Sequence, residues 1–252
     1  MQSPPSSESF ASEAQAEECR SFILRQLELK MKPAGVRKAP PPGPAIAISR
    51  RTGSGAHEIA EQTARLLQEA EPKRSIPWTV FDRQLVEKVL EEHHLPQALA
   101  RFMPEDRRSF IQDVMEELVG LRPSSWVMVP RIAKTVLHLA TMGRVILVGR
   151  GANFITARMP NVFHVRLIAS VPTRIERLQK QNGLTPEESA SFVRNEDRAA
   201  GRYLKSHFRV SIEDDTHYHL VINTDRIPCA DAAALIAEGA RRSFQGVFGG
   251  SK

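Results

Sequence analysis

The residues with the clearest chemical potential lie in the stretch "SRRTGSGAHEI" (residues 49–59), which follows the apolar run "AIAI". Gly53 and Gly55 allow a tight turn that brings backbone N–H groups close to phosphate oxygens. A lysine normally follows the second glycine of such a loop, but Ala56 stands there. Because backbone amides form the cradle, its loss leaves the anion site intact. We therefore predict a phosphate-binding loop, made of Gly53, Ser54, Gly55, Ala56 and His57.

The missing lysine would supply charge at the outer phosphates, where charge shifts during phosphoryl transfer. Arg50, Arg51 and His57 are the nearby residues that can replace it. The pattern has a simpler interpretation too, because glycine pairs close many ordinary strand-to-helix turns, and a histidine at a helix start is often merely tolerated. The apolar run before the glycines, the helical pattern after them and the adjacent arginines favour phosphate binding.

Three further segments carry charge where a predicted strand ends. They are "FDRQL" with Asp82, "VILVGRGANFI" with Arg150, and "ASVPTRIERL" with Arg174 and Arg177. In open α/β sheets, ligands bind beyond the carboxyl ends of the strands, so we expect these segments to converge on the loop. Asp82 can alternatively cap the helix that follows it. Arg150 can alternatively form a structural salt bridge.

The elements that must position these residues alternate along the chain. Apolar strands are predicted at 45–49, 78–81, 144–148, 162–169 and 218–223, with helical patterns between them. Strands that are apolar on both faces and separated by helices indicate a parallel sheet covered by helices on both sides.

Two of the connections are longer than a simple crossover. The 62 residues between "WTVF" and "RVILV" are mostly helical in pattern and are predicted to form a lid or a substrate-binding subdomain. After the fourth strand, Thr185 to Glu188 fits a capping box, which predicts a helix carrying Arg194, Arg198 and Arg202. These arginines can alternatively form an ordinary solvent-exposed helix face.

Five stretches, in this order, make the chain resemble the cytidylate kinase-like group of the nucleoside-monophosphate kinases. They are "AIAISRRTGSGAHEIAEQ", "FDRQLVEKV", "VILVGRGANFI", "VRLIASVPTRIERL" and "YHLVINTDRI", and the match runs from about residue 45 to 240. The resemblance implies an α/β P-loop three-layer fold with a five-stranded parallel sheet and strand one at its centre. It also implies a helical insertion after strand two, a short lid after strand four, and transfer of the γ-phosphoryl group of ATP, with Mg²⁺, to a nucleoside monophosphate, CMP or dCMP.

The resemblance assigns expected roles to individual positions. Residues Gly53 to His57 match the phosphate loop, and Asp82 and Arg150 match strand ends that face the acceptor nucleotide. Cofactor contacts are expected from the loop and from Arg174 and Arg177, which match the helix that leads into the lid. Catalytic charge is expected from Arg51, Arg150 and the residues that match lid arginines, Arg198 and Arg202.

The chain departs from the family pattern at two places. True cytidylate kinases have lysine where Ala56 stands and an acidic residue where Val148 stands. The cytidylate kinase-like group commonly lacks the lysine too, but tends to have glycine and arginine where this chain has Ala56 and His57. An alternative function is therefore a non-catalytic nucleotide-binding module that acts as a sensor or binds a partner protein.

Composition sets the outer limits of this interpretation. The chain has 252 residues, 41% of them hydrophobic, and we expect one kinase-like domain at 45–246. The net charge of +6 comes without a long basic tract, so nucleotides are the expected partners and nucleic acid is not. No apolar run is long enough to span a bilayer and the N-terminus does not have the form of a secretory signal, so we expect a cytoplasmic protein without membrane contact.

Residues 1–44 differ from the rest and hold seven of the 17 prolines. We predict a flexible arm that contains an amphipathic helix, with Ala16, Cys19, Ile23 and Leu27 along one stripe, and a proline-rich linker after it. The helix either folds back on its own domain or binds a protein partner. With the linker separating it from the first strand, the arm is expected to be dispensable for folding.

Overall fold

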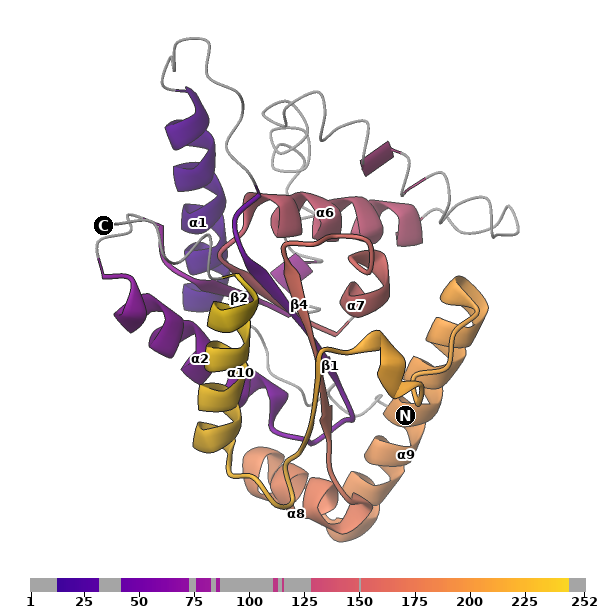
Figure 1. Cartoon of the computed structure of the whole chain (residues 1–252). Helices are drawn as coiled ribbons and strands as arrows, with labels where there is room; N and C mark the ends of the chain where they lie inside the picture. Colours follow the sequence, from indigo (N-terminus) through magenta and orange to yellow (C-terminus); the bar gives the residue numbers. More distant parts are fainter. Residues whose placement is uncertain are drawn as a thin grey trace.

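A computed structural model describes residues 13–31, 42–72, 76–82, 85–86, 111–112, 115, 128–149 and 151–244. Its centre is a five-stranded parallel sheet with the strand order β2-β3-β1-β4-β5 (Figure 1). The strands are β1 (Ala45–Arg50), β2 (Thr79–Phe81), β3 (Val145–Val148), β4 (Val162–Ile168) and β5 (Leu220–Asn223). The predicted α/β P-loop fold with strand one at the centre of the sheet is confirmed.

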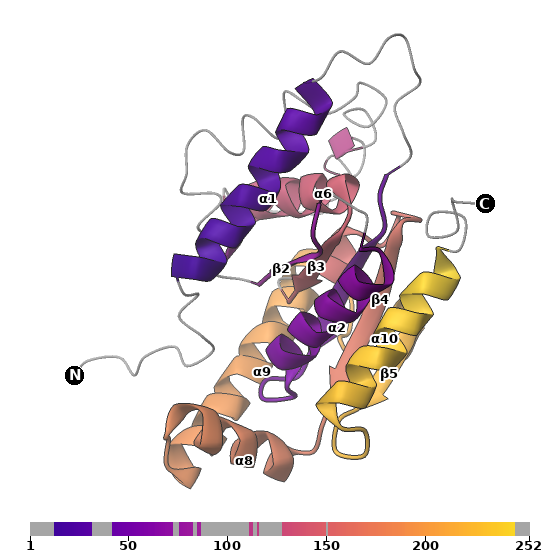
Figure 2. The same ribbon diagram turned by 90° about the vertical axis from the view of Figure 1, so that its left-hand side faces the viewer.

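Two helices cover one face of the sheet. These helices, α2 (Ala56–Ala70) and α10 (Cys229–Ser243), lie side by side in Figure 2. Ile46 and Ile48 of β1 point to this face and pack in one core cluster with Ile59 of α2 and Ile236 of α10. Since successive side chains of a strand point to opposite faces, Ala45 and Ala47 of the same strand belong to the other core cluster.

The other face carries α6 (Met128–Met142) and the short helix α7 (Ala152–Ile155). Leu137 and Leu139 of α6 and Ile155 of α7 are fully or almost fully buried against the sheet. Both faces are thus closed by apolar side chains, which explains why the strands read as continuous apolar runs rather than alternating ones.

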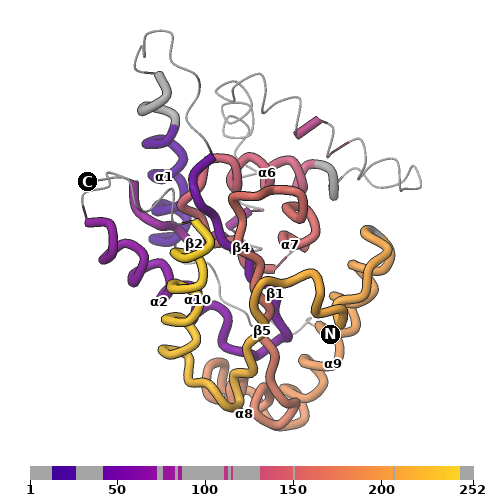
Figure 3. Tube along the Cα trace, viewed as in Figure 1, coloured from indigo at the N-terminus to yellow at the C-terminus, as the bar shows by residue number. Residues whose placement is uncertain are grey.

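The helices α8 (Val171–Asn182) and α9 (Pro186–Phe208) lie beyond the end of the sheet at which β1 finishes (Figures 2 and 3). The predicted capping box at the start of α9 is present: the Glu188 N–H donates to Thr185 Oγ1, and the Thr185 N–H donates to Glu188 Oε2. After α9 a short 3-10 helix, η1 (Asp215–His217), leads into β5. The segment between β4 and β5 therefore lies beside the loop after β1.

The long connection after β2 falls for the most part outside the described residues, so its predicted role in substrate binding stays a prediction. Of this connection the structure describes short helical pieces at 85–86, 111–112 and 115, and then α6. The pieces contribute Leu85, Val86 and Ile111 to the core cluster on the α6 face.

The N-terminal helix α1 (Glu13–Met31) is folded back on its own domain and contacts β2. Its Cys19 and Ile23 are buried as the stripe predicted, and so is Phe22, which packs edge-on against Phe81 at a ring-centroid distance of 5.8 Å. This packing argues against the expectation that residues 1–40 are dispensable for folding, because three buried side chains of α1 are part of a core cluster. The domain boundary at residue 44 and a partner for the arm stay predictions.

The stability of the domain should depend on this packing. We expect Phe22→Ala to lower the free energy of unfolding by about 3–5 kcal/mol, the usual cost of removing a buried phenylalanine ring. Leu24→Ala, on the same helix but 46% exposed, is the matched control and should change it by less than about 0.5 kcal/mol. Urea unfolding of both variants measures the difference, and equal effects would show that α1 is not packed as core.

Candidate nucleotide-binding site

The loop between β1 and α2 has the backbone conformation that the glycines predict. Gly53 and Gly55 have φ values of +79° and +82°, in the left-handed region that favours glycine. A Cβ atom at Gly53 would lie 2.8 Å from the carbonyl oxygen of Arg174, and one at Gly55 would lie 3.0 Å from Cys229 Sγ. Within the part of the chain that the structure describes, the N–H groups of Gly53 and Gly55 have no hydrogen-bond acceptor. The loop therefore has the form of an anion cradle with donors available.

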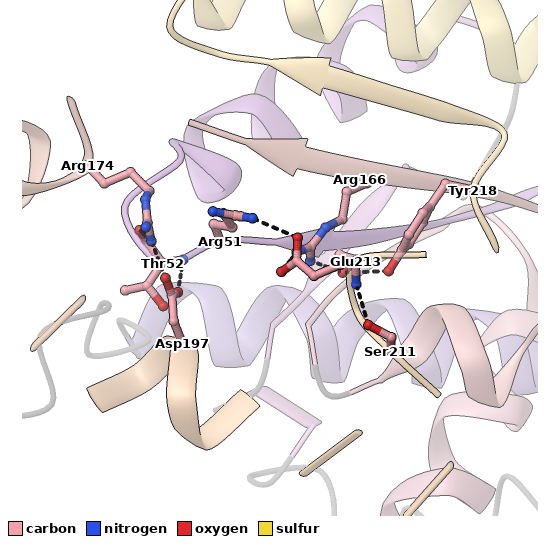
Figure 4. A network of polar contacts seen from close by, with 9 residues as sticks. Arg51, Thr52, Arg166, Arg174, Asp197, Ser211, Glu213 and Tyr218 are labelled. Carbon is pink, nitrogen blue, oxygen red and sulfur yellow. Dashed lines mark hydrogen bonds and ion pairs between the residues drawn. The ribbon is translucent and has the colours of Figure 1, made fainter. Parts of the chain in front are cut away.

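Arg174 of α8 binds the first part of this loop through hydrogen bonds (Figure 4). Its side chain is 1% exposed, and Nη1 donates to the carbonyl oxygen of Thr52 at 3.2 Å and to Asp197 Oδ2 at 2.6 Å. The Thr52 N–H in turn donates to Asp197 Oδ1 at 3.3 Å. A single carboxylate of α9 thus binds both a loop amide and the buried cation that supports the loop.

Arg177, one turn further along α8, is linked to the second part of the loop through Thr224, the residue that follows β5. Its two Nη atoms donate to the hydroxyl and the carbonyl oxygen of Thr224, at 2.8 and 2.7 Å. The Thr224 hydroxyl donates to the carbonyl oxygen of Ser54 at 3.1 Å. Arg177 also lies next to Gly55, since a Cβ there would be 3.9 Å from Nη1. The predicted convergence of the α8 arginines on the loop is therefore present.

A second charged group lies at the end of β1 (Figure 4). Arg51 Nη2 donates to Glu213 Oε2 at 2.7 Å, and Arg166 Nη2 of β4 lies 4.0 Å from Glu213 Oε1. Arg166 is 1% exposed, donates from Nη1 to Ser49 Oγ at 2.8 Å, and lies over the Tyr218 ring at 5.9 Å. Burial lowers the pKa of the Arg166 guanidinium, while Tyr218 and Glu213 act in the opposite direction.

A cavity of about 280 Å³ opens beside this group, between the ends of β1 and β3 and the side of α9. Its polar lining includes Ser49, Arg50, Asn153 and Glu196, and its apolar lining includes Phe154, Ala199, Ala200, Tyr203, Leu204 and Ile212. A concave site that combines apolar side chains with polar groups can hold a small molecule.

Two sequence-predicted residues have other contacts in this structure. The imidazole of His57 is turned to Gln15 and Glu61, each at 3.1 Å, rather than into the loop. Asp82 accepts a hydrogen bond from the Leu85 N–H at 2.9 Å, which is the alternative capping role. Their predicted roles toward nucleotides have no support from these contacts and stay predictions. Arg150 lies outside the described residues.

Arg198 and Arg202 are exposed on α9, on the side of the helix opposite the cavity. The residues of α9 that line the cavity are Glu196, Ala199, Ala200, Tyr203 and Leu204. At 100° per residue, Arg198 and Arg202 project away from this set. Their predicted role as lid arginines that contact a phosphate stays a prediction.

Sequence reasoning missed the residues that link the loop to the α9 segment: Arg166, Asp197 and Glu213. Arg166 carried a usable signal, since an arginine in the middle of the apolar run "VFHVRLIA" must be buried and needs a partner. Asp197 and Glu213 carried none, because each stands in a polar stretch and finds its partners only through the tertiary fold.

Residues 45–226 match the profile of a known family, described as Cytidylate kinase-like family. The matched segment spans more than half of the 252 residues and contains β1 to β5, the loop after β1 and α9. The chain belongs to the cytidylate kinase-like family. A search of curated protein sequences found no relative.

Three solved structures that are similar to this cytidylate kinase-like chain are distant from it in sequence. An uncharacterized protein from Eubacterium ventriosum is 16% identical with a TM-score of 0.51, over 77% of this chain and 96% of that one. A gluconokinase from Sinorhizobium meliloti has 15% identity and a TM-score of 0.40, over 84% and 98% of the two chains. A shikimate kinase from Bacteroides thetaiotaomicron has 15% identity and a TM-score of 0.38, over 80% and 98%. The first of these supports the fold alone.

Two kinds of feature are absent from the described residues of this family member. None of its described helices is long and apolar enough to cross a membrane. The same residues contain no cluster of three or more histidine, cysteine or acidic side chains of the kind that holds a metal ion.

The loop geometry generates a direct test. We expect Gly55→Val to lower affinity for a nucleoside triphosphate by at least about tenfold, because a branched side chain there strains the left-handed backbone and meets Cys229 Sγ, which shifts the loop amides. Gly183→Val is the matched control for backbone strain: Gly183 also has a positive φ, +65°, but a Cβ there meets nothing within 4 Å. Both variants carry a backbone strain of about 1–3 kcal/mol, and only Gly55→Val also disturbs the loop. Calorimetry that finds equal affinities in the two variants would contradict the assignment of the loop.

Proposed function

We propose that this protein is a nucleoside-monophosphate kinase, which transfers the γ-phosphoryl group of ATP to a monophosphate such as CMP or dCMP. The observation that carries the proposal is the loop Thr52–Gly55, with its left-handed glycines and available amides, at the carboxyl edge of the sheet and close to a cavity. Phosphoryl transfer needs positioning and charge neutralisation more than a protein nucleophile. Membership of the cytidylate kinase-like family supports the same reaction class.

The residues present fit a triphosphate. Gly53 and Gly55 have positive φ values, and Arg174 and Cys229 pack against the positions where their side chains would stand. The backbone N–H groups of the two glycines are the donors that would bind phosphate oxygens. The N-terminus of α2, which begins at Ala56, adds a favourable dipole for the anion. Mg²⁺ commonly binds through one or two protein groups and the phosphates themselves, and when bound it would neutralise charge on the transferred group.

The departures from the family pattern favour a second function, a nucleotide-binding module without catalysis. Ala56 is buried in the core cluster under α2 and brings no charge to the loop. Val148, where true cytidylate kinases have an acid, is buried at the end of β3. Three arginines oppose this alternative, because nucleotide binding alone would not require so many cations at the site. They are Arg51, Arg166 and Arg177.

A coupled assay separates the two functions. Purified protein with ATP and magnesium is offered each nucleoside monophosphate in turn, and release of ADP is followed. We expect turnover with a cytidine monophosphate above that with the other bases. Triphosphate binding without turnover on any monophosphate would establish the binding module instead.

The lid arginines give a further prediction. Arg198→Ala or Arg202→Ala should lower kcat by roughly ten- to a thousandfold with a smaller effect on ATP affinity, by analogy with arginines supplied to a transition state on closure. Arg241→Ala is the control, since Arg241 is an exposed arginine of α10. Ala56→Lys should leave kcat unchanged or raise it. If the wild type has no turnover and Ala56→Lys creates it, the natural protein is a binding module.

A further inference from the structure

Arg166 is a buried charge for which the fold alone provides few partners. It lies in the centre of the sheet on β4 with a side chain that is 1% exposed. A guanidinium has five N–H donors, yet among the described residues Arg166 donates one hydrogen bond, to Ser49 Oγ. Burying a charge costs several kcal/mol unless it is paired and hydrogen-bonded. The Glu213 carboxylate at 4.0 Å is close enough to attract it but too far for a hydrogen bond.

The Glu213 carboxylate lies between Arg51 and Arg166, where an anionic ligand could also lie. One of its oxygens accepts from Arg51 Nη2 at 2.7 Å, and the other faces Arg166 Nη2. Its own side chain is 61% exposed, and it lies in the loop between α9 and η1 rather than on a packed element. An ion pair with such an exposed partner contributes little net stability, so a ligand with more charge can displace it.

The surroundings indicate what that ligand is. Ser49, which accepts from Arg166, and Ile212, next to Glu213, both line the 280 Å³ cavity. Phe154 and Tyr203 in the same lining offer aromatic surface for a nucleoside base. Arg51 directly precedes the loop Thr52–Gly55. A nucleoside in the cavity would therefore place its 5′ end between the two arginines and the loop.

We propose that Arg51 and Arg166 bind the phosphate group of the acceptor, a phosphomonoester dianion, and that Glu213 occupies their site until the acceptor displaces it. A phosphate brings three oxygens and up to two charges to two guanidinium groups, each of which can bind two oxygens at once. Bound there, it lies beside the loop that would hold the triphosphate, as direct transfer between the two requires. This inference rests on the proposed function, whose acceptor it places.

The test removes the competing carboxylate. Glu213→Gln keeps the size of an exposed side chain, and Glu187→Gln, in the exposed first turn of α9, makes the same charge change away from the site. We expect Glu213→Gln to bind inorganic phosphate roughly three- to tenfold more tightly than the wild type, as measured by calorimetry, because a like charge and an ion pair no longer oppose the anion. Glu187→Gln should match the wild type. Adding Arg51→Met or Arg166→Lys to Glu213→Gln should abolish the gain.

Two comparisons locate the phosphate. CMP should gain affinity in Glu213→Gln and cytidine should not, whereas Mg·ADP, which uses the loop amides, should be unaffected. A gain for Mg·ADP in place of CMP, or no difference between Glu213→Gln and Glu187→Gln, overturns the assignment. If Glu213→Gln lowers the melting temperature and leaves phosphate affinity unchanged, the role of Glu213 is purely structural. That result also overturns the assignment.

The phosphate measurement does not depend on catalysis, so the two proposals can fail separately. If Glu213→Gln gains phosphate affinity while no monophosphate is phosphorylated by the wild type, the anion site stands and the kinase proposal fails. If the wild type phosphorylates a monophosphate while the variant gains nothing, the kinase proposal stands and the anion site fails.

Discussion

The buried guanidinium of Arg174 joins the parts of the molecule on which the site depends. It is anchored in α8, it binds the carbonyl oxygen of Thr52 in the loop, and it pairs with Asp197 of α9. The backbone of Arg174 also contacts Gly53 so closely that no side chain would fit there. Because the Arg174 guanidinium is buried, removal of Asp197 would leave a buried charge without its carboxylate, so this contact helps to fix where α8 and α9 lie relative to the loop.

Two carboxylates already accept hydrogen bonds from donor groups at the start of the loop. Asp197 Oδ1 accepts from the Thr52 N–H, and Glu213 accepts from Arg51, so two carboxylates of the segment after α8 satisfy donors at the start of the phosphate loop. Both are on or next to the helix that the family resemblance identifies with the lid. A phosphate that binds these donors must displace carboxylates from them, which couples anion binding to the position of α9. Coupling of this kind is how a lid can respond to its ligand without a separate sensor.

Much of the fold could be predicted from the sequence, and less of the site. Apolar strands and the Thr185–Glu188 box depend on neighbours in the chain, so their positions were predicted within one or two residues. The central position of β1 came from the family resemblance rather than from the residues themselves, and the order of the other strands was not predicted. The roles of His57 and Asp82 depend on which side chain lies nearby, and the nearest partners proved to be Glu61 and the start of the next helix.

The missing lysine has a different meaning once these contacts are known. A lysine at position 56 would bring its charge to the triphosphate, whereas Arg51 and Arg166 stand at the end of β1 and within β4, on the side of the cavity. Arg51 and Arg166 would therefore serve the proposed acceptor, whereas Arg177 lies beside Gly55 of the loop. Before an anion arrives, Glu213 neutralises part of the charge of Arg51 and Arg166. Charge for the transferred group would then become fully available only with the acceptor in place, which disfavours transfer to water.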